Sequence, residues 1–144
     1  MGSETIRRAA KVHLITDLQI EYAITSRSLE RSILSTCREL GIDITAYGVL
    51  GRGLLGGKWR QDQSAQAGDI RSIIPLFQGE NLQKKNLNLV ERIRLIALGH
   101  SASISQIAIA WSLSKGDDIF SLIGARRLEQ VYDALGALEI SLSS

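Results

Sequence analysis

The feature of this sequence that most constrains the fold is a short apolar segment, Ile42 to Tyr47, that runs directly into a glycine-rich loop. The apolar segment predicts a β-strand. Five glycines follow within ten residues, which lets the backbone approach a ligand where a Cβ atom would clash. Arg52 and Lys58 add positive charge, which suits a phosphate or pyrophosphate. The alternative is a plain flexible loop, because the glycine spacing matches neither a Walker loop nor the Rossmann fingerprint.

Composition limits the class of protein. With 144 residues, 44% of them hydrophobic, the chain has enough apolar side chains for the core of one domain. A formal net charge of +2 is too small to indicate a nucleic-acid or membrane partner, and no apolar run is long enough to cross a bilayer. The single cysteine, Cys37, favours a reducing, cytoplasmic setting. One cysteine and two distant histidines, His13 and His100, give no zinc-site pattern.

Strands and helices alternate along the chain. Strands are expected over Asp17–Ala23, Ile42–Tyr47 and Asp118–Ile123. Helices are expected over Ser3–Val12, Leu29–Leu40, Asn81–Leu98, Ser103–Ser114 and Leu128–Leu135, and a long loop over Gln61–Gly79. This order predicts an α/β fold in which right-handed crossovers place three parallel strands side by side. Three strands are an incomplete layer, since a whole (β/α)₈ barrel takes typically about 250 residues.

Five segments occur together in order and at a specific spacing: Asp17–Tyr22, Ile44–Lys58, Phe77–Asn81, Ile107–Trp111 and Leu122–Arg127. In this the chain resembles the C-terminal half of an aldo-keto reductase, most of all the bacterial and plant branch. The resemblance covers essentially every residue and implies one partial domain over 1–144. It also implies a partial TIM (β/α)₈ barrel whose three strands are equivalent to strands six to eight, with NADP(H) bound at their C-terminal ends.

The resemblance implies a binding site for the nicotinamide and the pyrophosphate. Gln19 matches the glutamine that hydrogen-bonds the nicotinamide carboxamide, and Tyr47 matches the aromatic residue that stacks on its ring. From the residues alone, Gln19 reads equally as a polar side chain at a strand end and Tyr47 as ordinary packing. The loop over the pyrophosphate is matched by Gly48, Leu50, Arg52, Gly53 and, in a supporting role, Lys58.

The resemblance further implies an adenosine site. Gly124, Ala125 and Arg126 match the segment around the 2′-phosphate, and Asp133 matches the acidic residue that faces the adenine amine. Gln130 stands where an arginine commonly contacts the adenine or the 2′-phosphate. Because that exchange removes a charged phosphate partner, we expect a weaker preference for NADP over NAD, with Arg126 compensating in part.

The catalytic set of the family is not matched in this sequence. Family catalysis uses an Asp, a Tyr acid, a Lys and a His from strands that precede the matched region, and the Tyr gives a proton while NADPH delivers hydride. His13, His100 and Cys37 read instead as surface or core residues. We therefore expect no catalytic residue here and no activity of the chain alone, as in a truncated product or one half of a split enzyme. A non-catalytic interaction module is the alternative; a DNA-binding helix pair is a distant third.

Association is expected from the open sheet. A three-stranded segment has two edges with free N–H and C=O groups. Leu18, Ile20, Ile44, Phe120 and Leu122 are expected to face the barrel interior and to leave an exposed apolar patch. The sequence therefore predicts self-association, binding of a complementary N-terminal half, or partial unfolding.

Overall fold

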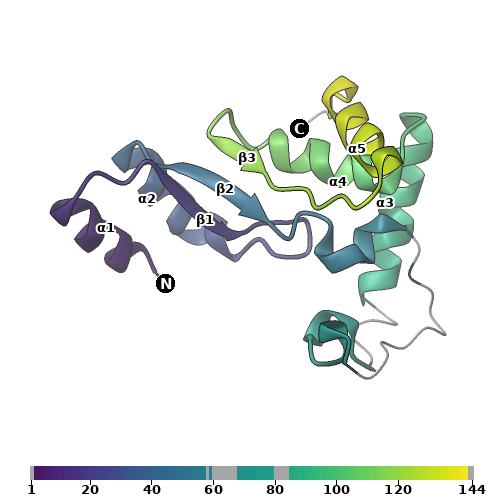
Figure 1. Ribbon diagram of the computed structural model, residues 1–144, viewed down its shortest axis with the longest axis horizontal. Coiled ribbons are helices and arrows are strands. Elements are labelled where there is room, and N and C mark those ends of the chain that lie inside the picture. The colour runs from purple at the N-terminus through teal and green to yellow at the C-terminus, as the bar shows by residue number, and fades with distance from the viewer. Residues whose placement is uncertain (1, 58, 60–67, 80–84, 143–144) are drawn as a thin grey trace.

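The fold is built on a parallel three-stranded sheet with helices along it, in a computed structural model that describes residues 2–57, 59, 68–79 and 85–142 (Figure 1). The strands are β1 (Asp17–Glu21), β2 (Asp43–Tyr47) and β3 (Ile119–Ser121), in the order β1-β2-β3. Both strand pairs are parallel, and Thr45 lies opposite Gln19 on one side and opposite Phe120 on the other. The predicted α/β partial barrel with three adjacent parallel strands is therefore confirmed.

Helices connect the strands and lie at both ends of the sheet (Figure 1). The α-helices are α1 (Ser3–Val12), α2 (Ile33–Leu40), α3 (Leu87–Gly99), α4 (Ile104–Leu113) and α5 (Leu128–Leu135). Short 3₁₀ turns cover Ser28–Arg31, Gly51–Gly56, Ile70–Ser72, Pro75–Phe77 and Gly136–Glu139. In the described part of the chain, no single helix has the length and apolar character to cross a membrane. Among the described helices, only α3 and α4 taken together have the required length and apolar character, and the chain bends by 89° between these two helices.

Several predicted boundaries are wrong. The helix expected over Leu29–Leu40 is a 3₁₀ turn followed by α2, and the two are separated at Ser32, whose φ of −159° is not helical. Within the 3₁₀ turn, Glu30 accepts hydrogen bonds from the Tyr22 hydroxyl and the Arg27 guanidinium. β1 ends at Glu21 because the next residues form a tight turn in which Ala23 bridges to Ser26.

One later strand is shorter than expected. β3 covers only Ile119–Ser121 of the predicted Asp118–Ile123, although the Asp118 carbonyl and the Leu122 N–H also hydrogen-bond β2. In the region of the helix predicted over Asn81–Leu98, α3 follows a π-helical turn at Lys85 and Asn86, and residues 81–84 lie outside the described residues. Of the loop predicted over Gln61–Gly79, the described part, residues 68–79, contains two 3₁₀ turns.

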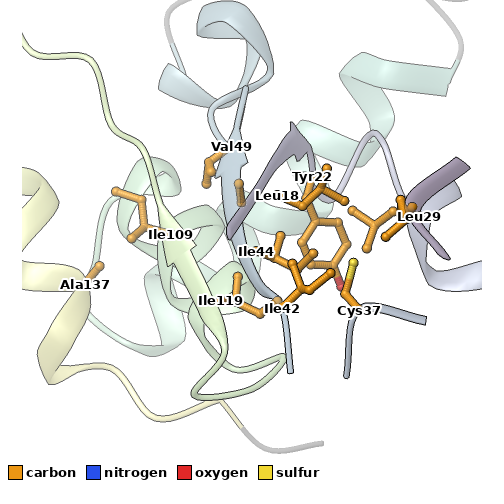
Figure 2. Packing of buried hydrophobic residues seen from close by; sticks show 12 residues of the cluster. Leu18, Tyr22, Leu29, Cys37, Ile42, Ile44, Val49, Ile109, Ile119 and Ala137 are labelled. Carbon is orange, nitrogen blue, oxygen red and sulfur yellow. The ribbon is translucent and has the colours of Figure 1, made fainter. Parts of the chain in front are cut away.

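One face of the sheet is covered by helices. Leu18, Ile44 and Ile119 lie in one row across the three strands and are buried. Ile6 of α1, Cys37 of α2 and Ile109 of α4 pack into the same cluster. Figure 2 shows the Tyr22 ring and the Cys37 side chain close to Leu18, Ile42 and Ile44 within this cluster. The covered face is thus a complete hydrophobic core made within the chain.

The opposite face of the sheet is open and mixed in character. It carries Gln19, Thr45 and Phe120 in one row, with the Thr45 hydroxyl donating to Asp17 at 2.5 Å. The prediction that Leu18, Ile20 and Ile44 face the barrel interior is therefore wrong, because these residues face the helices. Of the residues predicted for the interior, Phe120 and Leu122 are 54% and 47% exposed. Exposed apolar side chains on this face thus gather at the β2–β3 side, where Tyr47 also lies, while the β1 positions on it are polar.

A second hydrophobic cluster lies under the glycine loop. Leu54 and Leu55 are fully buried there against Ile93 of α3 and Ile107 of α4. The Trp59 and Phe77 rings meet edge to face with centroids 4.7 Å apart. Because its two leucines are anchored in this core, the loop after β2 is held in a defined position.

Candidate functional site

The backbone after β2 has the conformation that its glycines predict. Gly48, Gly51 and Gly53 have positive φ angles of 71°, 55° and 95°. A Cβ atom at Gly48 would also lie 3.3 Å from the Cγ atom of Glu21, which is tighter than ordinary packing. Arg52 has a φ of 53°, a left-handed conformation that is uncommon for a residue with a side chain. Strain of this kind persists where the surroundings fix it, and it is concentrated at functional sites.

A cavity of about 760 Å³ lies between this loop, the segment after β3 and α5. It is lined by the glycine loop, Arg71, the start of α4 and the segment from Leu122 to Ala134, which the fold brings together. The predicted cofactor-binding residues at its wall are Gly48, Leu50, Arg52, Gly53, Gly124, Arg126, Gln130 and Asp133. The cavity is large enough to hold a substantial part of a dinucleotide, since ligand pockets commonly measure about 300–1,000 Å³.

The remaining predicted residues lie outside this wall. Gln19 is on the open face of β1 and Tyr47 ends β2 on the same face, where its side chain is 37% exposed. Ala125 is exposed and does not line the cavity. Lys58 lies outside the described residues. The open face of the sheet and the cavity thus meet at the carboxyl end of β2, as expected for a ligand that extends from one to the other.

The charge of the cavity is mainly positive. Its wall contains Arg52, Arg71, Arg126 and Arg127, against the carboxylates of Glu129 and Asp133. Within the described residues, neither Arg52 nor Arg126 is paired with a carboxylate. Unpaired guanidinium groups beside exposed backbone amides suit phosphate oxygens.

Arg71 is a cavity residue that the sequence did not identify as a site residue. Its guanidinium hydrogen-bonds both oxygens of Asp69, lies 4.9 Å from the centre of the Trp59 ring, and approaches Gly53. The hydrogen bonds from Arg71 hold the pKa of Asp69 below its ordinary value. Because its charge is balanced by Asp69, Arg71 stabilises the loop wall more than it adds net charge.

Gln130 has a structural task in the free chain. Its Oε1 atom accepts the backbone N–H groups of Arg126 at 2.8 Å and Arg127 at 3.1 Å. It therefore holds the turn that leads from β3 into α5. Only this half of a capping box forms, because the N-cap residue Arg127 has no side-chain acceptor, so the sequence lacked the usual Ser or Thr signal.

Asp133 is held by a residue that sequence reasoning missed. The Ser105 hydroxyl donates to its Oδ2 atom at 2.9 Å, and Ser105 also lines the cavity. Ser105 lies in the first turn of α4, next to the capping box of Ser103 and Gln106, which was predicted and is confirmed. No sequence signal links Ser105 to a residue 28 positions away.

The other reactive side chains lie away from this cavity. Burial raises the pKa of the Tyr22 hydroxyl, and the hydrogen bond that it donates to Glu30 at 2.7 Å raises it further. Burial also raises the pKa of the Cys37 thiol. His13 and His100 are exposed. Among the described residues, no three His, Cys, Asp or Glu side chains are placed to hold a metal ion.

A smaller cavity of about 370 Å³ lies near the ends of β1 and β2. Glu21, Thr25, Arg52, Pro75 and Lys85 are among its lining residues. Arg52 lines both cavities, so the glycine loop forms a common wall.

Comparison with known proteins gives a consistent family. The family model described as "Aldo/keto reductase family" matches residues 2–144. A probable aldo-keto reductase 1 from Glycine max is 41% identical over 140 residues, which are 97% of this chain and 40% of that protein. The aldo-keto reductase yakc [NADP(+)] of Schizosaccharomyces pombe is 38% identical over 145 residues, covering 99% and 42%.

Solved structures agree in fold. The glycerol dehydrogenase AKR11B4 from Gluconobacter oxydans superposes with a TM-score of 0.91 at 29% identity, over 99% of this chain and 43% of that one. An aldo-keto reductase from Klebsiella pneumoniae, solved with NADPH, superposes with a TM-score of 0.67 at 20% identity, over 98% and 40%. This chain thus spans about two fifths of the length of the relatives it matches. By the match over residues 2–144, the chain belongs to the aldo/keto reductase family.

Proposed function

We propose that this chain is the cofactor-binding half of an NADP(H)-dependent oxidoreductase that reduces aldehydes or ketones. The observation that carries the proposal is the 760 Å³ cavity, whose lining includes Arg52 from the glycine loop and Arg126 from the segment after β3. The name of the Schizosaccharomyces pombe relative specifies NADP(+), and family membership gives the reaction class.

In this proposal the cofactor lies along the carboxyl end of the sheet. Tyr47 stacks on the nicotinamide ring. Gln19, on the open face of the neighbouring strand β1 and two residues before the partner of Tyr47, hydrogen-bonds the carboxamide. Gly48, Leu50, Arg52 and Gly53 contact the pyrophosphate, with Lys58 beside them. Gly124, Ala125 and Arg126 surround the 2′-phosphate, while Asp133 accepts the adenine amine. Gln130 contributes by holding the Arg126 backbone rather than by binding phosphate directly.

The chain alone holds the cofactor but does not catalyse reduction. Bound NADPH supplies the hydride, whereas the new alkoxide also needs a positioned proton donor, which is worth typically about 10²–10⁴-fold in rate. Tyr22 does not take this role, because its hydroxyl is buried and donates to Glu30. The donor is therefore supplied from outside these residues.

A titration of the full chain with NADPH tests the proposal, with Trp59 and Trp111 as fluorescent reporters. Saturable quenching that weakens in Arg52→Ala and Arg126→Ala supports it. No saturation up to millimolar NADPH would favour the alternative, a non-catalytic interaction module in which the loop is a relic. An NADPH-oxidation assay with a reactive aldehyde completes the test, since robust turnover by the pure chain would contradict the assignment of catalysis to another segment.

The partner that fits best is a complementary N-terminal half, and self-association is the second possibility. β1 and β3 are the two edge strands of the described sheet. In α5, which packs against α4, no residue is buried, and its exposed apolar stripe comprises Leu128, Val131, Tyr132, Leu135 and, just beyond the helix, Leu138. A strand added at β3 with its helix against this stripe would cover both. The free, buried Cys37 suits a reducing, cytoplasmic setting for this assembly.

Size-exclusion chromatography with light scattering distinguishes these assemblies. A complex with an added N-terminal half supports the first, and a dimer of the chain supports the second. A monodisperse monomer of 15.8 kDa that does not bind the added N-terminal half would contradict both proposed assemblies.

A further inference from the structure

Asp133 is one of two carboxylates, with Glu129, in a cavity wall that also contains four arginines. No arginine of the wall pairs with it in the described structure. Its hydrogen-bond partner is the neutral Ser105 hydroxyl, which donates to Oδ2 at 2.9 Å. A carboxylate that remains unpaired beside guanidinium groups is free to accept a hydrogen bond from a ligand, and Oδ2 is already directed by Ser105.

Ser105 is itself well placed to hold that carboxylate. It stands in the first turn of α4, whose start is fixed by the Ser103–Gln106 capping box. The Ser103 and Ser105 hydroxyls lie 3.3 Å apart, so a chain of hydrogen bonds can connect the helix cap to Asp133. Both Ser105 and Asp133 are partly buried and both line the cavity. A short side chain on a rigid helix end therefore sets the direction of the carboxylate.

We propose that Ser105 is a positioning residue for base recognition, which fixes the Asp133 carboxylate so that its free oxygen accepts the exocyclic amine of adenine. The inference rests on the proposed function, because it assumes that the cavity binds NADP(H). It goes beyond that function because it gives Ser105, which does not itself touch the cofactor, a role in base selectivity. That selectivity is the discrimination between an amino group and an oxo group on the base. A carboxylate attracts the amine of adenine and repels the carbonyl oxygen of hypoxanthine, so its direction decides the discrimination.

The test uses the full chain and two probes, NADPH and its hypoxanthine analogue, in which an oxo group replaces the adenine amine. The unmodified chain is expected to bind NADPH more tightly than the analogue. Ser105→Ala is expected to weaken NADPH about three- to tenfold, as for loss of one hydrogen bond, and to leave the analogue nearly unchanged. Ser105→Thr keeps a hydroxyl and is expected to restore the discrimination. Ser35→Ala, on the exposed side of α2, is the matched control and should change neither affinity.

A double substitution distinguishes two roles of Ser105: orienting the Asp133 carboxylate, or only linking α4 to α5. If Ser105 acts through Asp133, the pair Ser105→Ala/Asp133→Ala binds NADPH no more weakly than Asp133→Ala alone. Equal weakening of both probes by Ser105→Ala, or additive losses in the double variant, would overturn the inference while the proposed function stands. Failure of the unmodified chain to bind either probe would refute the proposed function and the inference together.

Discussion

The two faces of the sheet differ by a single step along each strand, yet they have opposite roles. Leu18, Ile44 and Ile119 form a buried row on the covered face. One residue further on, Gln19, Thr45 and Phe120 form a row on the open face. Since side chains alternate along a strand, a shift of one residue exchanges the two faces completely. The register therefore determines which residues make the core and which remain for a ligand or partner.

The two faces also differ in how far the helices of this chain cover them. The covered face is filled by α1, α2 and α4, whereas the open face leaves Phe120 and Leu122 about half exposed beside Tyr47. Stability and ligand binding should accordingly be separable, because they depend on different rows of the same strands.

The largest expected effect is on the covered face. Ile44→Ala should lower the free energy of unfolding by about 2–5 kcal/mol, because it removes a fully buried side chain and leaves a cavity. Thr45→Ala, the neighbour on the open face, should cost about 1 kcal/mol or less, since it loses a surface hydrogen bond to Asp17. Urea unfolding followed by circular dichroism measures both. Equal losses would mean that the open face is also part of the stabilising core.

The next effect is on ligand binding from the open face. Tyr47→Ala should weaken NADPH binding by roughly two- to tenfold, because an aromatic contact is worth about 0.5–1.5 kcal/mol. The urea midpoint should hardly move, since Tyr47 is partly exposed. Tyr132→Ala, an exposed tyrosine on α5, is the control and should leave NADPH affinity unchanged. A Tyr47 variant that loses stability but retains affinity would reverse the roles assigned to the two faces.

Local sequence patterns predicted much of this fold. The order of the strands follows from their alternation with helices, and the start of α4 follows from Ser103 and Gln106. The face assignment of Leu18 and Ile44 failed for a physical reason. Alternation shows that two faces exist, but which face the helices cover depends on how distant segments pack.

The candidate site divides in the same way. The loop from Gly48 to Gly53 was predictable because only glycine readily adopts its positive φ angles. The Ser105–Asp133 hydrogen bond was not, since it joins two helices across 28 residues. The roles assigned to Gln19, Tyr47 and Arg126 stay predictions until binding is measured.

A smaller effect is expected at the adenosine end of the cavity. Arg126→Ala should weaken NADPH by about 1 kcal/mol, roughly fivefold, and NADH much less, because only NADPH carries the 2′-phosphate. The ratio of the NADPH affinity to the NADH affinity is the measurement, and in the unmodified chain it should fall as salt is raised, because salt screens the attraction of Arg126 for the phosphate. Arg8→Ala, on exposed α1, keeps the same change of net charge and should leave the ratio unaltered. An unchanged ratio in Arg126→Ala would place the phosphate elsewhere.

The smallest expected effect is on the pH dependence of stability, and it should leave ligand binding unchanged. The hydrogen bond from Arg27, followed by the one from Tyr22, holds the pKa of Glu30 below its ordinary value. A lowered pKa in the folded chain means that the ionised carboxylate stabilises the fold above about pH 4.3, the ordinary glutamate value. This contribution is lost as pH falls through the lower, folded pKa. Arg27 is largely exposed, so solvent screening keeps the contribution within about 1 kcal/mol.

Glu30→Gln should therefore reduce stability slightly at pH 7 and flatten the decline below pH 4.3, measured by urea unfolding across pH. Asp118, whose pKa is lowered by Arg38, also contributes to the acid decline, so Asp118→Asn should flatten it independently. NADPH affinity at pH 7 should be the same in Glu30→Gln as in the unmodified chain, because Glu30 and Tyr22 lie behind the covered face. If the loss of stability at acid pH is unchanged in Glu30→Gln, the Arg27–Glu30 pair contributes no stability. If Glu30→Gln instead weakens NADPH binding, the two faces of the sheet are coupled through the turn after β1.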